Sequence, residues 1–210
     1  MEYFTSDWHL GHDRIRELCK RPHNSVEEMD KDILNKFFDT VDIHDTVYYL
    51  GDLGWKGDVI ENFIKSIWEK GIFNFKFIWI LGNHDLKFKE FILNLVKKYS
   101  YLEVYDSLLD IIIDDQPITL CHYPMITWNK SHFGAWQLYG HHHQDYSGDF
   151  KYIRDNFNLG KQYNVACDMN EFNLFSFKEI KLHMDHQNDN WDFLSEKSQD
   201  RLNYTKPTNE

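Results

Sequence analysis

The chain has 210 residues, of which 42% are apolar and 17% aromatic, so we expect one folded domain with a sizeable core. Its formal net charge of -11 is opposite in sign to that of proteins that neutralise a phosphate backbone, which argues against binding to duplex nucleic acid. A small phosphorylated ligand stays compatible with this charge, because bound metal ions supply local positive charge. The three cysteines are widely spaced, no leader-like segment precedes the first apolar run, and no run approaches membrane-spanning length. We therefore expect a cytoplasmic protein with no disulfide framework and no membrane partner.

Strand and helix patterns alternate in the first half of the chain. Ser25 is followed three residues later by Glu28, which is typical of a helix start, and apolar residues then recur at helical spacing as far as Thr40. In chain order, the patterns predict a strand over 2–6, a helix over 25–40, a strand over 46–50, a helix over 59–69, a strand over 75–81 and a helix over 86–99.

The second half is richer in strands. Patterns over 109–113, 117–122, 135–139 and 162–166 predict four more strands. Ser176, with Glu179 placed for a capping box, predicts a short final helix. The composition becomes polar after about residue 186, so we expect one domain over 1–186 and a polar tail over 187–210. The element pattern is typical of a layered α/β domain with a mixed sheet and helices on its outer faces.

Five of the predicted strands end in polar clusters, within "FTSDWHLGH", "YYLGDLGW", "WILGNHD", "ITLCHYP" and "WQLYGHHHQD". Ligands bind outside the carboxyl ends of strands in α/β sheets, so these clusters are expected to meet at one edge. Because side chains alternate along an extended strand, an Asp-x-His unit would place both side chains on one side. The clusters supply Asp7, His9, His12, Asp52, Asn83, His84, Asp85, His122, His141, His142, His143 and Asp145.

This set combines carboxylate, imidazole and amide groups and includes no obvious thiolate. Mixed oxygen and nitrogen ligands suit Mn²⁺, Fe, Zn²⁺ or Ni²⁺. About seven ligands exceed one tetrahedral site and suit two neighbouring ions, which can together hold a nucleophile and the oxygens of an in-line displacement at phosphorus. Each motif alone is weak, since a single His122 would more often be a hydrogen-bonded core histidine. The five in this order form a strong signal.

The ordered set "DWH", "GD", "GNHD", "H" and "GHHH", over about residues 3–143, resembles the calcineurin-like metallophosphoesterases. The stretches "FTSDWHLGH", "RPHNSVEEMD", "HYPMITWNKSHFGAWQLYGHHH" and "NVACDMNEFNLFSFKEI" resemble one small bacterial and phage branch of that superfamily and extend the resemblance to about Lys181. The resemblance implies a four-layer α/β/β/α sandwich with mixed sheets, and it makes a homodimer possible.

The resemblance also implies a dinuclear metal centre of two divalent ions, with Mn²⁺ first and Fe, Zn²⁺ or Ni²⁺ as alternatives. Asp52 would bridge the ions, and His84 would lie beside the phosphate, where it protonates the leaving oxygen or stabilises the transition state. Asp85 is expected to cap the helix that follows it, with a supporting contact behind the metal ligands as the alternative. The implied ligands are Asp7, His9 and His143 for one ion and Asn83, His122 and His141 for the other.

The sequence differs from three well-defined groups of enzymes within this superfamily. Protein Ser/Thr phosphatases of the superfamily carry a second Asp where "GDLGWKG" has Trp55, and a Glu where this chain has Asp85. The lipid A precursor hydrolases have an Arg at the position of His84. DNA-repair nucleases share Gly-Asn-His-Asp but are longer and carry DNA-binding additions. All three assignments are therefore disfavoured.

The function expected is that of a metal-dependent phosphoric ester hydrolase. A metal-bridged hydroxide would attack a small, nucleotide-like phosphodiester or phosphomonoester, and His84 would assist the leaving group. Two alternatives stay open: a nuclease acting on single strands or ends, and a non-catalytic scaffold with the same fold. Possible phosphate contacts are Lys56, Arg16, Arg21 and Lys130, although a solvated surface charge is the simpler interpretation of each. Candidate substrate-binding residues are His12, Lys56, Trp128, Asn129 and His132.

Overall fold

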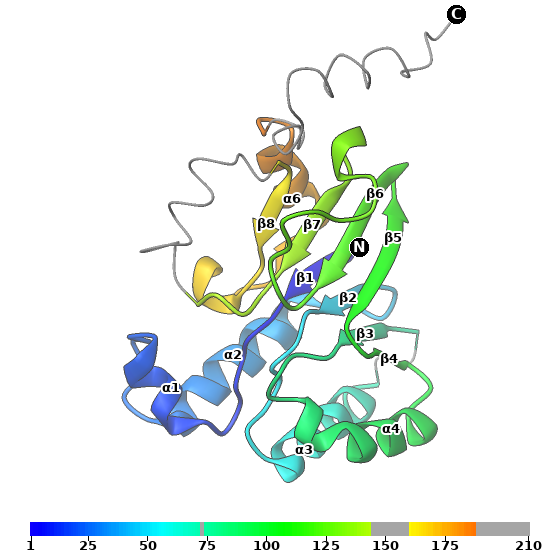
Figure 1. Cartoon of the computed structure of the whole chain (residues 1–210). Helices are drawn as coiled ribbons and strands as arrows, with labels where there is room; N and C mark the ends of the chain where they lie inside the picture. The colour runs from blue at the N-terminus through cyan, green and yellow to red at the C-terminus, as the bar shows by residue number, and fades with distance from the viewer. Residues whose placement is uncertain (72–73, 144–159, 188–210) are drawn as a thin grey trace, which may run out of the picture.

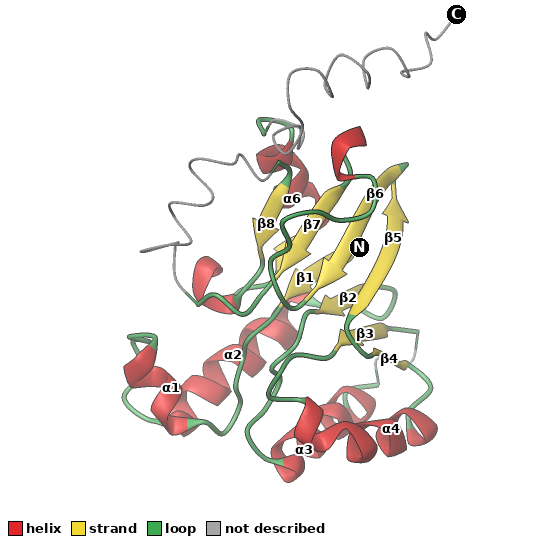
Figure 2. Ribbon diagram, in the orientation of Figure 1, coloured by secondary structure: helices red, strands yellow, loops and turns green. Residues whose placement is uncertain are grey.

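A computed structural model describes residues 1–71, 74–143 and 160–187 of the chain (Figures 1 and 2). Its first sheet contains β1 (Glu2–Thr5), β2 (Thr46–Tyr49), β3 (Lys76–Ile80), β4 (Leu102–Tyr105) and β9 (Phe175–Ser176). The strand order is β4-β3-β2-β1-β9, with β1 to β4 parallel and β9 antiparallel to β1. Parallel neighbours end at the same edge, so the loops after β1, β2 and β3 lie next to one another.

The second sheet contains β5 (Leu108–Ile113), β6 (Gln116–Cys121), β7 (Trp136–Tyr139) and β8 (Gln162–Asn164), in the order β5-β6-β7-β8. β5 pairs with β6 in antiparallel fashion, and β6, β7 and β8 are parallel. Both sheets are therefore mixed, as the sequence predicts.

Helices cover the outer face of the first sheet, on the side away from the second sheet (Figure 2). They are α1 (Asp13–Leu18), α2 (Val26–Thr40), α3 (Gly57–Glu69) and α4 (Lys89–Lys98), the last preceded by the 3₁₀ turn η1 (Leu86–Phe88). Helix α2 begins where the sequence predicts, because the Ser25 hydroxyl accepts a hydrogen bond from the Glu28 N–H. The buried faces of α2, α3 and α4 form one core cluster with the strands, centred on the buried rings of Trp8, Phe37 and Phe77.

A second core cluster fills the space between the two sheets. Phe4 and Ile80 of the first sheet meet Leu120 and Leu138 of the second, all of them fully buried. Helix α6 (Phe177–Met184) completes this cluster, with Phe177 stacked on Trp136. The predicted capping box is confirmed: Glu179 N–H donates to the Ser176 hydroxyl, and the Glu179 carboxylate accepts from Ser176 N–H.

Among the described residues, the connection between β6 and β7 packs against part of the outer face of the second sheet. The buried Gln137 side chain of β7 donates to Tyr123 O at 2.8 Å and accepts from Met125 N–H at 3.0 Å. This connection contains the 3₁₀ turn η2 (Ser131–Phe133).

The mixed α/β architecture with two mixed sheets agrees with the prediction. Among the described residues, one α-helix and two strands were not predicted: α1, the edge strand β4 and the two-residue strand β9. The helix predicted over 86–99 is divided, because its first turn is the 3₁₀ turn η1. The predicted tail lies, apart from Gln187, outside the described residues, so the domain division stays a prediction.

Candidate metal centre

The seven side chains predicted to bind metal gather where the loops of the two sheets meet. Loops after β1, β2 and β3 come from the first sheet, and loops after β6 and β7 come from the second. Close groups that could hold an ion are Asp7 with His9 and His143, Asp52 with His122 and His141, and Asp52 with His9 and His84. Asn83 lies beside the second group, with its Oδ1 3.1 Å from His122 Nε2.

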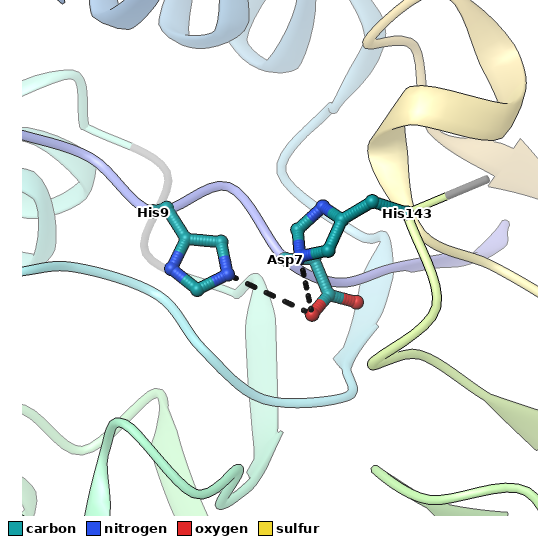
Figure 3. A group of neighbouring side chains, drawn as sticks. All are labelled: Asp7, His9 and His143. Atoms are coloured by element: carbon teal, nitrogen blue, oxygen red, sulfur yellow. Dashed lines mark ion pairs between the residues drawn. The ribbon is translucent and has the colours of Figure 1, made fainter. Parts of the chain in front are cut away.

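The first group is centred on the Asp7 carboxylate (Figure 3). Asp7 Oδ1 lies 3.9 Å from His9 Nε2 and 3.7 Å from His143 Nε2. The other carboxylate oxygen, Oδ2, accepts hydrogen bonds from the Ser6 hydroxyl and from His141 N–H. One oxygen is therefore held by the protein, and the other faces the two imidazoles.

Polar atoms without partners mark the centre of this group. Asp7 Oδ1, His9 Nδ1 and His9 Nε2 are all buried and have no hydrogen-bond partner. Buried polar atoms are almost always paired, because an unpaired one loses its hydration without replacement. A carboxylate oxygen and an imidazole nitrogen left facing each other in this way fit a divalent cation between them.

The second group is centred on His122, whose side chain is 1% exposed. Its Nδ1 lies 2.7 Å from Leu50 O, so Nδ1 carries the proton and Nε2 is left as a potential ligand. That Nε2 lies 3.5 Å from Asp52 Oδ2. The donor set of this group, imidazole nitrogens with carboxylate and amide oxygens, also fits a divalent ion.

Asp52 contacts both groups. Its Oδ2 lies 3.7 Å from His9 Nε2 as well as 3.5 Å from His122 Nε2. Its Oδ1 accepts a hydrogen bond of 2.8 Å from His84 N–H, which fixes the plane of the carboxylate. Asp52 thus lies between the two groups, and its role as a bridging ligand stays a prediction.

Burial and neighbouring charges shift the pKa values of His9, His122 and Asp52 away from their usual values. Burial lowers the pKa of His9 to about 2, so its imidazole is neutral. Burial opposes protonation of His122 too, but the hydrogen bond and charge of Asp52 outweigh it and raise the pKa to about 9. For Asp52, burial disfavours the ionised form, but His122 lowers the pKa to about 2. Asp52 is therefore ionised. His122 carries a second proton, on Nε2, which a cation binding at that nitrogen would displace.

His84 differs from the other imidazoles in its exposure. Its side chain is 36% exposed, against 3% for His9 and 1% for His122. Its Nε2 lies 4.0 Å from Asp52 Oδ2, at the edge of the cluster. The ring packs against Trp55, with centroids 5.3 Å apart, and against His9, at 5.2 Å. His84 thus borders the centre and faces solvent.

The local backbone at four of the predicted ligands is left-handed. Asp7, His9, Asp52 and His141 have φ values of 60°, 52°, 62° and 67°. The expectation that extended alternation aligns Asp7 with His9 is therefore wrong. The chain has already left the β conformation, and two left-handed residues turn both side chains inward.

Glycines immediately before three of the predicted ligands allow the loops to approach closely. A Cβ atom at Gly82 would overlap the Asp52 carboxylate, and one at Gly140 would overlap Asp7 Oδ2. A Cβ atom at Gly51 would overlap the ring of His122. Each of these glycines therefore makes room for a ligand that belongs to a neighbouring loop.

Asp85 does not cap the following helix, contrary to the sequence-based expectation. It stands at the N-cap of η1 but makes no side-chain capping bond. Its buried carboxylate instead accepts hydrogen bonds from Asp52 N–H at 2.7 Å, Gly82 N–H at 2.8 Å, Leu53 N–H at 3.1 Å and the Trp79 indole at 3.1 Å. Asp85 therefore joins the loops after β2 and β3.

The predicted substrate residues divide into two sets. His12 stacks on Trp55, with ring centroids 3.8 Å apart, beside His9, and Lys56 is an exposed residue at the N-cap of α3. Trp128, Asn129 and His132 lie at the amino end of β7, whereas His141 and His143 follow its carboxyl end. The Trp128 ring is buried, with its indole N–H donating to Ala135 O. Of the five, the structure thus places His12 beside the centre.

Sequence reasoning missed the side chain that supports His143. Asp168, in the 3₁₀ turn η3 (Cys167–Asn170), places its Oδ2 2.7 Å from His143 Nδ1. The only signal was that Asp168 lies in "NVACDMNEFNLFSFKEI", a stretch that contributes to the family resemblance but in which no site residue was predicted. His142 is half-buried next to this group, and Asp145 lies outside the described residues.

A family model for calcineurin-like phosphoesterases matches residues 3–203, which is most of the chain. The chain belongs to the calcineurin-like phosphoesterase family. It is 29% identical over 168 residues to an uncharacterized protein of Methanocaldococcus jannaschii, covering 80% of this chain and 81% of that protein. It also matches the crystal structure of a protein of unknown function from Aquifex aeolicus, with a TM-score of 0.66 and 26% sequence identity. That match covers 87% of this chain and 98% of the other.

Membership of this family implies metal-dependent hydrolysis of phosphoric esters, and the Asp and His groups described above could bind the metal. Within the described ranges, no helix combines the length and apolar character needed to cross a membrane. The cytoplasmic location stays a prediction from the sequence.

Proposed function

We propose that this calcineurin-like phosphoesterase uses two divalent metal ions to hydrolyse a small, nucleotide-like phosphodiester or phosphomonoester. The observation that carries the proposal is the buried, unpartnered set of Asp7 Oδ1 and His9 Nε2, next to a second group that shares Asp52. Two adjacent sites with a carboxylate between them suit displacement at phosphorus better than a single structural site does.

Asp7, His9 and His143 would hold one ion, and Asn83, His122 and His141 the other, with Asp52 in contact with both. Mn²⁺ is the first candidate, because the oxygen and nitrogen donors match it, and Fe, Zn²⁺ or Ni²⁺ are alternatives. The ions, when bound, would supply positive charge to the phosphoryl oxygens and lower the pKa of the attacking water.

The protein itself would position and protonate the substrate. His84 reaches the edge of the cluster with a partly exposed imidazole, where it can donate a proton to the leaving oxygen or a hydrogen bond to the phosphoryl group. Its backbone N–H donates to the Asp52 carboxylate, so the residue proposed to contact the substrate is held directly to the residue that would contact both ions. We also propose that His12, stacked on Trp55, contacts the substrate beside His84.

The net charge of -11 favours a small substrate over a polynucleotide, although a nuclease acting on ends would use the same centre. A non-catalytic scaffold is less favoured, because the chain keeps every predicted ligand together with His84. A homodimer stays a prediction from the family resemblance.

The test compares hydrolysis of bis(p-nitrophenyl) phosphate and p-nitrophenyl phosphate by metal-stripped protein refilled with Mn²⁺. The His84→Ala variant should lose about 10²–10⁴-fold in kcat while keeping its metal content. His142→Ala is the matched control, since it removes a neighbouring imidazole that is not a predicted ligand.

Faster cleavage of the diester would assign a phosphodiesterase, and faster cleavage of the monoester a phosphatase. Full activity of His84→Ala with both metals bound would remove the proposed role of His84. Failure to cleave either ester, with two ions demonstrably bound, would favour the scaffold or a highly selective pocket.

A further inference from the structure

Two sequence stretches that lie outside the five predicted ligand clusters meet in a buried ion pair. Arg21 belongs to "RPHNSVEEMD", and Asp168 belongs to "NVACDMNEFNLFSFKEI". Arg21 Nε donates to Asp168 Oδ1 at 2.8 Å, and Arg21 Nη2 donates to Asp168 Oδ2 at 2.7 Å. The Arg21 side chain is 0% exposed and that of Asp168 is 7% exposed. A two-pronged pair of this kind fixes both the position and the plane of the carboxylate.

The fixed carboxylate in turn orients His143. Asp168 Oδ2 lies 2.7 Å from His143 Nδ1, so Nδ1 donates its hydrogen to this oxygen. The opposite nitrogen, Nε2, then points toward Asp7 Oδ1 at 3.7 Å. A carboxylate behind a metal-binding histidine selects the tautomer and raises the basicity of the ligand.

The guanidinium of the pair also holds the segment that carries Asp7. Arg21 Nη2 donates to Asp7 O at 2.6 Å, and Nη1 donates to Trp8 O at 2.8 Å. The Cys167 thiol donates to the same Asp7 carbonyl. These bonds surround a residue with φ of 60°, a conformation that needs support from its neighbours. One ion pair thus contacts both Asp7, in the loop after β1 of the first sheet, and His143, in the loop after β7 of the second.

We propose that Arg21 and Asp168 are positioning residues that set the geometry of the first metal site. Asp168 aims His143 Nε2, and Arg21 fixes both Asp168 and the Asp7 backbone. This inference rests on the proposed function, since it assumes an ion at Asp7, His9 and His143. A pair with only a structural role would affect stability and leave the relative affinity of the two sites unchanged.

A different interpretation of the same cluster is a third metal site. Cys19, His143 and Asp168 lie close enough for one ion. Two contacts oppose it: the Arg21 guanidinium is bonded to the Asp168 carboxylate, and His143 Nδ1 is already a donor to that carboxylate. A cation there would face a fixed positive charge at short range. The cluster therefore supports the first site and does not form another.

The test measures metal affinity directly, by titrating Mn²⁺ into metal-stripped protein in a calorimeter. Asp168→Ala should weaken one of two Mn²⁺ sites by about 10–100-fold and leave the other unchanged. Asp168→Asn keeps the shape but loses the charge, and should show a smaller loss at the same site. Asp32→Asn is the matched control: Asp32 pairs with Lys36 and His23 near the same surface and touches no predicted ligand.

Folding of each variant is checked by circular dichroism, and a measurement on the wild type is independent of the variants. Long-range ¹H–¹⁵N NMR of Zn²⁺-loaded protein should show His143 protonated at Nδ1 and metal-bound at Nε2. Wild-type affinity at both sites in folded Asp168→Ala, or the reversed tautomer in the wild type, would overturn the inference.

The outcomes also separate this inference from the proposed function. If the wild type binds two ions but cleaves no ester, the proposed function fails and the positioning role is still decided by the titration. If the wild type binds no ion, both are wrong.

Discussion

At the residue scale, the predicted ligands adopt backbone conformations that are unfavourable for them. Asp7, His9, Asp52 and His141 are left-handed, which costs non-glycine residues roughly 1–3 kcal/mol each. The surrounding bonds offset this cost: Asp7 N–H donates to Gly51 O, and His9 N–H donates to Asp52 O. The ligand loops are thus ordered by the protein itself, and metal ions would find their donors already gathered.

The histidine pKa values predict that metal binding releases protons. Burial disfavours the protonated form of His143, but Asp168 outweighs this and raises its pKa to about 10, and His122 has a pKa of about 9. Both therefore carry a proton at pH 7 that must leave before Nε2 can bind a cation, whereas His9, with a pKa of about 2, has none to lose.

Affinity for Mn²⁺ should accordingly rise with pH between 6 and 8, by about tenfold per pH unit for each proton displaced. Calorimetric titrations in buffers of different ionisation enthalpy count the protons released. An affinity that stays constant over this range would contradict the assignment of these two protons.

The glycines before the ligands give a second prediction at this scale. Gly82→Ala should weaken metal binding and destabilise the fold by about 1–3 kcal/mol, because its Cβ would overlap the Asp52 carboxylate. Gly57→Ala is the control: its Cβ would lie 3.6 Å from Phe91, an ordinary contact, at the start of a helix. Metal titration and urea denaturation of both variants provide the comparison, and equal effects would argue against the close-approach explanation.

At the scale of elements, the loops after β2 and β3 act as one unit because they share the Asp85 carboxylate. Three backbone N–H groups and one indole N–H converge on it, and burial raises its pKa to about 6 despite these donors. One of the donors belongs to Asp52, so the position of the residue shared by both metal groups depends on a side chain that touches neither.

Asp85→Asn should therefore lower the free energy of unfolding by about 1–3 kcal/mol, because the amide nitrogen would face a backbone donor that loses its acceptor. Metal affinity should fall as well, through Asp52. Asp106→Asn removes the partner of an exposed ion pair with Lys89 and should change stability by less than about 1 kcal/mol. Urea denaturation of both variants tests this, and similar values would show that the Asp85 bonds contribute little.

The sequence predicted those elements that carry a periodic pattern or a cap. Helix α2 with Ser25, helix α6 with its capping box and the core strands of both sheets fall close to their predicted ranges. It failed where tertiary contacts decide. Strand β4 lies at a sheet edge, and only its first residue, Leu102, is buried, so it shows no clear alternating pattern. Strand β9 consists of two residues and is defined by their pairing with β1.

The candidate site divides in the same way. The ligand motifs are local and follow strand ends, so the sequence indicates which loops carry them, although the left-handed backbone that turns Asp7 and His9 inward was not predicted. Asp168 and Arg21 are 147 residues apart, and no local pattern connects them. Asp85 is a residue type that often caps helices, so its position before a helix pattern suggests a cap. Its carboxylate instead accepts hydrogen bonds from Asp52 and Leu53, which lie 33 and 32 residues earlier in the chain. Supporting contacts of this kind depend on how the loops pack, which the sequence alone does not specify.

At the scale of the whole molecule, a chain ending after Gln187 should keep the fold and its metal affinity. It retains every described element and every predicted ligand, although the family match extends to residue 203. We expect a melting temperature within about 4 °C of the full chain, equivalent to less than about 1 kcal/mol.

A chain ending after Asn173 is the contrasting control. It lacks β9 and α6, with the buried side chains of Phe175, Ile180 and Met184, and should not fold cooperatively. Thermal denaturation followed by circular dichroism compares the two. If the chain that ends after Gln187 also loses cooperative unfolding, residues 188–210 belong to the domain.

Each predicted metal group draws its ligands from both sheets, and this has a kinetic consequence. Asp7 and Asp52 follow strands of the first sheet, while His143 and His122 follow strands of the second. Neither site is complete until the sheets have docked, so bound ions stabilise contacts that form late in folding. Added Mn²⁺ should therefore lengthen the lifetime of the folded state and leave the refolding rate nearly unchanged. The ions would then protect the protein chiefly by slowing the separation of its two sheets.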